Sequence, residues 1–170
     1  MSTKTCNVLF LCTGNSCRSI LAECILNRLG EGRFRGFSAG SHPAGAVHPR
    51  ALALLARCGH PTGGLRSKDW GEFAAEGAPV MEAVITVCDN AAGEVCPIWP
   101  GRPASAHWGF PDPAAFRGGE AETEALFAEV YARIEERISR FVNLLPGAPG
   151  RPGLQRRLED FGKSATETGT

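Results

Sequence analysis

Apolar and polar positions along the chain follow two alternating patterns, which predict strands separated by helices. Residues 7–11 (NVLFL) form a short apolar run of the kind found in a strand that is buried on both faces. From Ser19 onward the apolar residues instead recur at helical spacing, and Gly30 is a residue suited to the end of a helix. The chain is therefore expected to begin with a strand, a turn over residues 12–18 and a helix.

The same alternation continues further along the chain. It predicts strands over 34–38 and 83–87, a short strand within 103–114, and helices from Pro49 to about Gly59 and from about 120 to 145. Strands that alternate with helices are typical of a parallel sheet covered by helices on both faces. We therefore predict the α/β class, as a single domain over residues 1–145 built on a twisted parallel sheet.

The residues after position 145 have a different composition. PGAPGRPG is typical of a linker, LQRRLEDFG predicts a short amphipathic helix, and the polar end KSATETGT is typical of a disordered segment. We therefore assign residues 146–170 to a Pro/Gly linker and a partly disordered C-terminal tail.

The charge balance argues against several classes of partner. The 170 residues include 18 Lys plus Arg and 18 Asp plus Glu, so the formal net charge is zero, which gives nucleic acid or a membrane surface no net charge to attract. The N-terminal apolar run is too short for a signal peptide, and no stretch approaches the roughly 20 apolar residues of a membrane span. We expect a cytoplasmic monomer that binds neither nucleic acid nor membranes.

Cysteine is unusually frequent for a cytosolic chain of this length. There are seven, at Cys6, Cys12, Cys17, Cys24, Cys58, Cys88 and Cys96. The odd number disfavours a secreted disulfide framework, which leaves catalysis or metal binding. The seven residues between Cys88 and Cys96 exceed the two to four that separate the cysteines of a structural zinc pair. The four residues between Cys12 and Cys17 and the five between His42 and His48 are within zinc-ligand ranges, but Cys12 and Cys17 lie in a strand-to-helix turn that suits an anion. We therefore predict no metal site and a catalytic use for some of these thiols.

The turn between the first strand and the first helix has the composition of an oxyanion site. A strand-to-helix turn directs backbone N–H groups inward, the helix N-terminus adds a partial positive charge, and Arg18 offers a planar guanidinium that can bind two oxygens. The same positive field favours the thiolate, and therefore nucleophilic, form of Cys12. The predicted oxyanion-binding residues are Thr13, Gly14, Asn15, Ser16, Cys17, Arg18 and Ser19. In addition, Ser19 is expected to donate to the sulfur and Asn15 to brace the loop.

The stretch VLFLCTGNSCRSILAE resembles the phosphate loop of the low-molecular-weight protein tyrosine phosphatases and of the arsenate reductases built on the same fold. The likeness extends over about residues 6–145 and includes FSAGS at 37–41 and the Asp112-Pro113 pair. In that superfamily the cysteine of C-x₅-R is the nucleophile and the aspartate of the DP pair is the general acid. The resemblance therefore implies that Cys12 is the nucleophile and Asp112 the acid.

Two further cysteines favour a reductase over a phosphatase. Phosphate ester hydrolysis needs one thiol, whereas reduction of arsenate to arsenite needs two electrons, which thiols supply when they become a disulfide. TVCDNAAGEVCPIWPG provides Cys88 and Cys96 around a small polar segment, and it resembles the arsenate reductases more than the phosphatases. We therefore predict an arsenate reductase with Cys12, Arg18, Asp112, Cys88 and Cys96 as catalytic residues. The alternatives are a phosphotyrosine phosphatase, in which Cys88 and Cys96 only pack, and an oxyanion-sensing protein without activity.

The resemblance also implies the co-substrates. No tightly bound cofactor is expected, and the reductant is either thioredoxin or glutathione with glutaredoxin, a choice that the sequence leaves open. Some members of the superfamily bind potassium beneath the loop, where this chain has Asn15, Glu23 and Ser38. Because Lys68 stands where an acidic partner would be expected, we predict no bound cation.

Overall fold

A four-stranded parallel sheet forms the centre of the computed structural model, which describes residues 5–88, 99, 103–144, 156 and 158. The strands are β1 (Cys6–Cys12), β2 (Phe34–Gly40), β3 (Ala83–Thr86) and β4 (Ala104–His107), and they lie side by side in the order β2-β1-β3-β4. All three pairings are parallel, with Cys12 opposite Gly40 and Leu11 opposite Thr86. The carboxyl ends of the strands therefore meet at one edge, where ligands bind in sheets of this kind.

Three α-helices and two 3₁₀ helices are the named helices of the described residues, apart from the helical positions 156 and 158 in the C-terminal tail. They are α1 (Arg18–Leu29), α2 (Pro49–Arg57), α4 (Glu120–Leu144), η1 (Trp70–Phe73) and η2 (Pro113–Ala115). The predicted α/β class is confirmed, and the predicted strands and helices are all present, with bounds that differ by one or two residues at most ends. The two 3₁₀ helices were not predicted, because one turn is too short to show periodicity. Each begins at an aspartate, Asp69 or Asp112, whose carboxylate accepts a backbone N–H two residues later.

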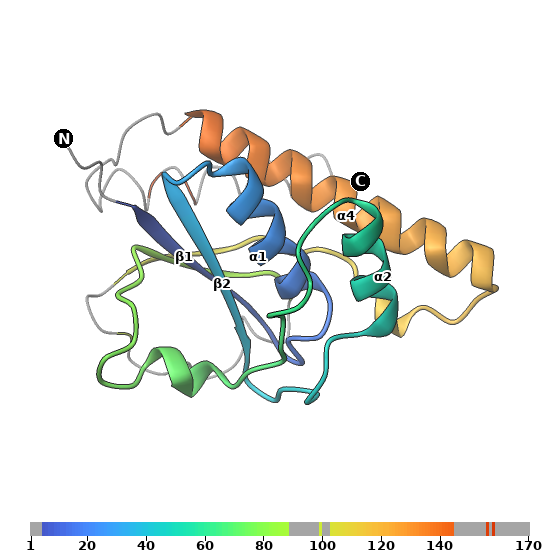
Figure 1. Cartoon of the computed structure of the whole chain (residues 1–170), viewed down its shortest axis with the longest axis horizontal. Helices are drawn as coiled ribbons and strands as arrows, with labels where there is room; N and C mark the ends of the chain where they lie inside the picture. The colour runs from blue at the N-terminus through green and yellow to red at the C-terminus, as the bar shows by residue number, and fades with distance from the viewer. Residues whose placement is uncertain (1–4, 89–98, 100–102, 145–155, 157, 159–170) are drawn as a thin grey trace.

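The main core lies between one face of the sheet and the three α-helices. Val8 and Phe10 of β1 point into it and are fully buried, as are Ile20 and Ile138 from α1 and α4. Figure 1 shows α4 running across α1 on this side of the sheet. The predicted apolar face of the last helix is therefore a buried face, and it packs against α1.

The opposite face of the sheet has a smaller core. It is formed by Leu9, Leu11, Met81 and Val84 together with Phe73 of η1. In Figure 1 the green η1 segment lies on the side of β2 away from α1 and α4. Helices therefore lie on both faces as predicted, although among the described residues a single 3₁₀ turn covers this second face.

Two of the described residues belong to the predicted C-terminal tail. Arg156 and Leu158 are helical, and Leu158 is fully buried in the main core whereas Arg156 is exposed, as an amphipathic helix requires. The predicted linker and disordered end lie outside the described residues, so the boundary at residue 145 stays a prediction.

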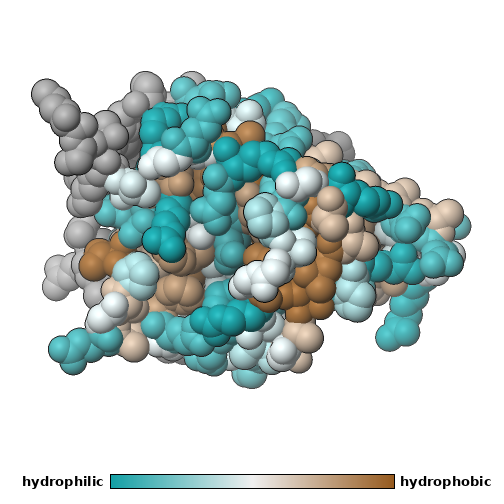
Figure 2. All heavy atoms as spheres, viewed as in Figure 1, coloured by the Kyte–Doolittle hydropathy of each residue, from teal (hydrophilic) through white to brown (hydrophobic). Residues whose placement is uncertain are grey.

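Few large apolar side chains are exposed among the residues that the structure describes. In the view of Figure 2 polar side chains cover most of the face shown. Among the described residues, Val80 and Phe116 are the large apolar side chains that are exposed. No helix in the described ranges is long and apolar enough to cross a bilayer.

Candidate active site

The turn that follows β1 places Cys12 at the carboxyl edge of the sheet. Cys12 is the last residue of β1 and Arg18 the first residue of α1, so the loop spans the gap between a central strand and a helix N-terminus. The first turn of α1 contains no acidic residue, which leaves the positive end of the helix dipole uncompensated. The predicted strand-turn-helix arrangement of the loop is therefore present.

The sulfur of Cys12 is buried beneath hydrogen-bond donors. The hydroxyl oxygen of Ser19 lies 2.9 Å from Sγ, and the backbone N–H of Asn15 donates to Sγ at 3.2 Å. Because Asn15 Nδ2 donates to Ser19 Oγ at 2.7 Å, the hydroxyl proton of Ser19 is free to point at the sulfur. The structure thus brings Ser19 and Asn15 to the positions expected for them, with two hydrogen-bond donors directed at the sulfur of Cys12.

The carbonyl groups of the loop point outward to a supporting segment over residues 42–48. The backbone N–H groups of His42, Ala44 and His48 donate to the carbonyls of Thr13, Gly14 and Ser16 at 2.8–2.9 Å. In a peptide unit the N–H points opposite to the C=O, so the N–H groups that follow these carbonyls face the inside of the loop. This is the arrangement that an oxyanion requires.

Two residues with unusual backbone requirements hold the loop close to the sheet. Asn15 has a φ of 45°, a conformation that asparagine tolerates better than most residues. A Cβ atom on Gly40 would lie 2.5 Å from the carbonyl oxygen of Thr13. Only glycine at position 40 therefore allows β2 to pass this close to the loop.

Arg18 connects the loop to the predicted acid. Its Nη1 donates to the carbonyl of Phe110 at 3.0 Å, and its Nη2 lies 3.5 Å from Oδ2 of Asp112. The other carboxylate oxygen of Asp112 accepts the N–H of Ala114 at 3.0 Å, which fixes the side chain at the start of η2. The structure therefore brings Arg18 and Asp112 together at the rim of the loop, with Asp112 still 39% exposed.

Cys88 reaches the same loop from the neighbouring strand. It follows β3, and its sulfur accepts the backbone N–H of Thr13 at 3.3 Å, with the Thr13 hydroxyl 3.6 Å away. The thiol is 2% exposed and free. The second sulfur of the predicted relay therefore lies against the residue next to Cys12. Cys96, the third, lies outside the described residues.

Cys17 differs chemically from Cys12 although both are in the loop. It is 3% exposed, and burial, together with the charge of Asp112, raises the pKa of the Cys17 thiol to about 12. At neutral pH it is therefore protonated and a poor nucleophile. It is the N-cap residue of α1, and its side chain makes no capping hydrogen bond.

Lys68 lies beneath the loop, and its contacts could not be read from the sequence. Its backbone N–H donates to Oδ1 of Asn15 at 2.8 Å, and its ammonium lies among oxygens of Asn15, Ser38 and Glu23. Burial lowers the pKa of Lys68, and the nearby Glu23 carboxylate opposes that shift. Within the described residues, no group of three or more His, Cys, Asp or Glu side chains is arranged to hold a metal ion.

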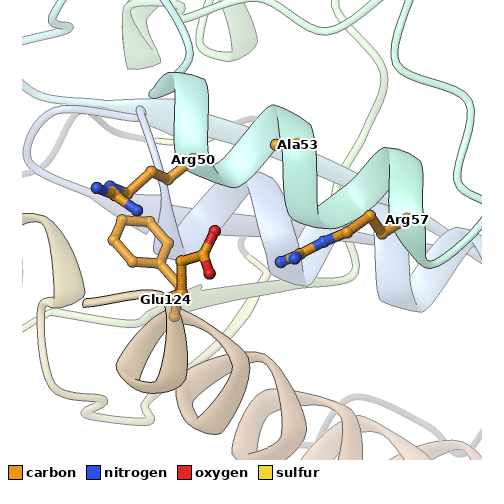
Figure 3. A pocket seen from close by; sticks show the side chains of 5 residues that line it. Arg50, Ala53, Arg57 and Glu124 are labelled. Carbon is orange, nitrogen blue, oxygen red and sulfur yellow. The ribbon is translucent and has the colours of Figure 1, made fainter. Parts of the chain in front are cut away.

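A hollow lies between α2 and α4. Arg50, Arg57 and Glu124 line it, and Figure 3 shows the Glu124 side chain pointing between the two arginines. Arg50 also pairs with Glu120 at 3.8 Å. The arginines of this hollow thus face carboxylates of the chain itself, and we assign the hollow no ligand.

Comparison with known proteins places this geometry in a family. Residues 7–148 match the family described as low molecular weight phosphotyrosine protein phosphatase. The chain belongs to this family, which confirms the superfamily resemblance found in the sequence.

Within the family, the similar proteins include arsenate reductases. An arsenate reductase of Bacillus licheniformis is 38% identical over 83% of this chain and 96% of its own length. The crystal structure of an arsenate reductase from Archaeoglobus fulgidus matches with a TM-score of 0.63 at 26% identity, over 80% of this chain and 98% of that one. The tyrosine phosphatase Wzb from Escherichia coli K30 matches with a TM-score of 0.65 at 20% identity, over 84% and 99%, which shows the shared fold alone.

Proposed function

We propose that this chain reduces arsenate to arsenite through a relay of cysteine thiols. The observation that carries the proposal is the position of Cys88, whose sulfur lies 3.3 Å from the N–H of Thr13 in a loop suited to a tetrahedral oxyanion. Hydrolysis of a phosphate ester has no use for a second thiol at this place. The similarity to proteins named arsenate reductase supports the same assignment.

In the first step the Cys12 thiolate attacks the arsenic of an arsenate held by residues 13–18. A sulfur–arsenic bond forms and one arsenic–oxygen bond breaks. Asp112, fixed at the rim beside Arg18, is placed to protonate the departing oxygen, which leaves as water. The inward N–H groups of the loop and the Arg18 guanidinium stabilise the charge on the remaining oxygens.

In the second step Cys88 attacks the sulfur of Cys12. A disulfide forms, the electron pair of the sulfur–arsenic bond stays on arsenic, and As(V) becomes As(III). Arsenate and two thiols thus give arsenite, water and a disulfide, so atoms and electrons balance. The Thr13 N–H holds the sulfur of Cys88 beside the loop, and the thiolate of Cys88 is the attacking species.

The disulfide must then be reduced by a thiol from outside the chain. Cys96 is proposed to attack Cys88, which would carry the disulfide to a pair that thioredoxin can reach. Glutathione with glutaredoxin is the other reductant of suitable chemistry, and then Cys96 is not required. Both reductants are cytoplasmic thiol systems, in keeping with the expected location of the chain.

A coupled assay separates the reductase from the phosphatase. Wild-type protein is supplied with arsenate and either the thioredoxin or the glutathione–glutaredoxin system, and NADPH consumption is followed. We expect arsenate-dependent turnover with one of the two. Cys88→Ser should abolish it, yet leave hydrolysis of p-nitrophenyl phosphate within about twofold, since that reaction uses only Cys12, Arg18 and Asp112.

The matched control for this assay is Cys58→Ser. Cys58 is a free thiol at the end of α2, so the same substitution there should leave both activities unchanged. Brisk hydrolysis of aryl phosphates with no arsenate turnover in either reductant system would contradict the proposal and identify a phosphatase.

A further inference from the structure

A buried ammonium group lies directly beneath the loop. Lys68 is 9% exposed, and its Nζ donates to the carbonyl of Arg66 at 2.8 Å, to Oγ of Ser38 at 3.4 Å and to Oδ1 of Asn15 at 3.5 Å. The carboxylate of Glu23 lies 3.8 Å from it. The three protons of the ammonium therefore each have an oxygen acceptor, and a carboxylate balances the charge.

The hydrogen-bond directions around the ammonium are consistent with one another. Ser38 donates its hydroxyl proton to Glu23 at 2.7 Å, so its oxygen is free to accept from Lys68. A buried charge is costly unless it is paired and hydrogen-bonded, and here these groups meet both requirements. An apolar residue would avoid the free-energy cost of burying a charge. We therefore expect a function of the Lys68 ammonium among its hydrogen bonds.

A chain of hydrogen bonds leads from this ammonium to the nucleophile. The backbone N–H and the ammonium of Lys68 both donate to Oδ1 of Asn15. These two donors establish that the amide oxygen of Asn15, and not its nitrogen, faces Lys68. Asn15 Nδ2 must then face Ser19, and its donation leaves the Ser19 hydroxyl proton to point at Cys12 Sγ, 2.9 Å away. Each donor polarises the next one in such a chain.

We propose that Lys68 is a positioning residue, an internal cation that orients Asn15 and Ser19 toward Cys12 and makes an added metal ion unnecessary beneath the loop. It acts on Cys12 through two other side chains and does not touch the oxyanion. The inference builds on the nucleophile of the proposed function. However, it applies equally to arsenate and phosphate ester chemistry, because Cys12 attacks in both.

Removing the ammonium should leave a set of oxygens that suits a small cation. The carboxylate of Glu23, the amide oxygen of Asn15, the hydroxyl of Ser38 and the carbonyl of Arg66 are the kind of ligands that hard cations prefer. Lys68→Ala opens space for such an ion, whereas Lys68→Met removes the charge but fills the space. This pair of variants separates the charge from the packing.

The test follows the rate at which iodoacetamide alkylates Cys12 at neutral pH, with the site identified by peptide mass spectrometry. This readout does not depend on which reaction the protein catalyses. Both Lys68 variants should react about tenfold more slowly than wild type, because the thiolate loses an oriented donor. Arg35→Ala, which removes an exposed cation from the strand that carries Ser38, should react like wild type.

Salt identity then distinguishes a positioning cation from a merely structural lysine. At about 0.1 M salt, potassium or methylammonium chloride should restore much of the rate in Lys68→Ala but not in Lys68→Met, and tetramethylammonium chloride should restore neither. Wild type should react equally in all three salts. Circular dichroism checks that each variant is folded, and if Lys68→Ala does not fold, Lys68→Met and the wild-type salt comparison decide.

Three results would overturn the inference. They are a wild-type rate in folded Lys68→Ala or Lys68→Met, a slow Lys68→Ala that no small cation restores, and a wild-type protein that potassium accelerates relative to tetramethylammonium. None of these would bear on arsenate turnover, so the proposed function stands or falls separately by the coupled assay.

Discussion

The sulfur of Cys88 accepts the backbone N–H of Thr13, the residue that follows Cys12, at 3.3 Å. The contact results from strand pairing: β3 lies beside β1, and the N–H of Val87 donates to the carbonyl of Leu11 at 2.8 Å, one residue beyond the end of β3. Position 88 is therefore held next to the loop by backbone hydrogen bonds, whatever its side chain. A thiol at that position is available for redox chemistry.

Asp112→Asn should slow both arsenate reduction and aryl phosphate hydrolysis. The amide keeps a side-chain oxygen for the N–H of Ala114, so the start of η2 is preserved, but it has no proton to give to a leaving oxygen. The expected loss in kcat is about 100-fold or more, measured by steady-state kinetics with each substrate. A variant that retains wild-type kcat on both substrates would remove Asp112 from the mechanism.

Gly40→Ala should damage the loop although glycine has no side chain to contribute to the chemistry. The added methyl group would lie 2.5 Å from the carbonyl of Thr13, so the loop must move away from β2. We expect about 1–3 kcal/mol lower unfolding free energy and weaker binding of phosphate as a test oxyanion, measured by urea denaturation and calorimetry.

The control for that substitution is Gly63→Ala, where a Cβ atom meets nothing within 4 Å. It should leave both stability and phosphate binding unchanged. Equal behaviour of the two variants would show that the close approach of β2 to the loop is unimportant.

Alkylation by iodoacetamide should discriminate among neighbouring cysteines. Burial raises the pKa of both the Cys17 and the Cys24 thiol to about 12, so at pH near 7.5 both remain protonated and slow to react. Brief labelling followed by fragmentation mass spectrometry should therefore find Cys12 modified before either of them. Modification of Cys17 at the same rate as Cys12 would contradict the assignment of Cys12 as the activated thiol.

Stability should fall in mild acid because of His60, a buried histidine outside the loop. Its ring Nε2 is 2.7 Å from the hydroxyl of Tyr131 and the residue is 6% exposed; burial, and then the charge of Arg28, lower the pKa of His60 below its usual 6.5. The unfolded chain therefore binds a proton more readily than the folded one as the pH falls through 6.5. Unfolding free energy should decrease over that window and be restored at higher pH.

The comparison variant is His60→Gln, which keeps a polar group near Tyr131 but cannot titrate. Its urea midpoint should depend less on pH between about 5 and 7 than that of wild type. Parallel pH profiles for the two proteins would exclude His60 as the source of the acid sensitivity.

The sequence predicted the sheet and the three α-helices. The long helix has 25 residues of regular periodicity, and the alternation of strands with helices indicates a parallel sheet. The one-turn helices η1 and η2 left no such pattern. The meeting of Cys12, Cys88 and Asp112 at one edge of that sheet follows from the parallel strand pairing that the structure shows.

Other parts of the site gave no signal that could be read from the chain. Residues 42–48 support the loop through backbone N–H groups, which almost any residue can supply, so their identities reveal nothing. Lys68 was noticed as a departure from the expected acidic residue, but only the fold brings its ammonium to Asn15 and Ser38. Ser67, whose hydroxyl donates to the carbonyl of Gly14, was missed for the same reason.

The most direct test of the relay is a single turnover by Cys96→Ser with arsenate and no added reductant. Arsenite would be quantified and the disulfides mapped by mass spectrometry without reduction. The account predicts one arsenite per active site and a Cys12–Cys88 disulfide that accumulates because it is not passed on. Absence of both arsenite and that disulfide, in a protein that still hydrolyses p-nitrophenyl phosphate, would contradict it.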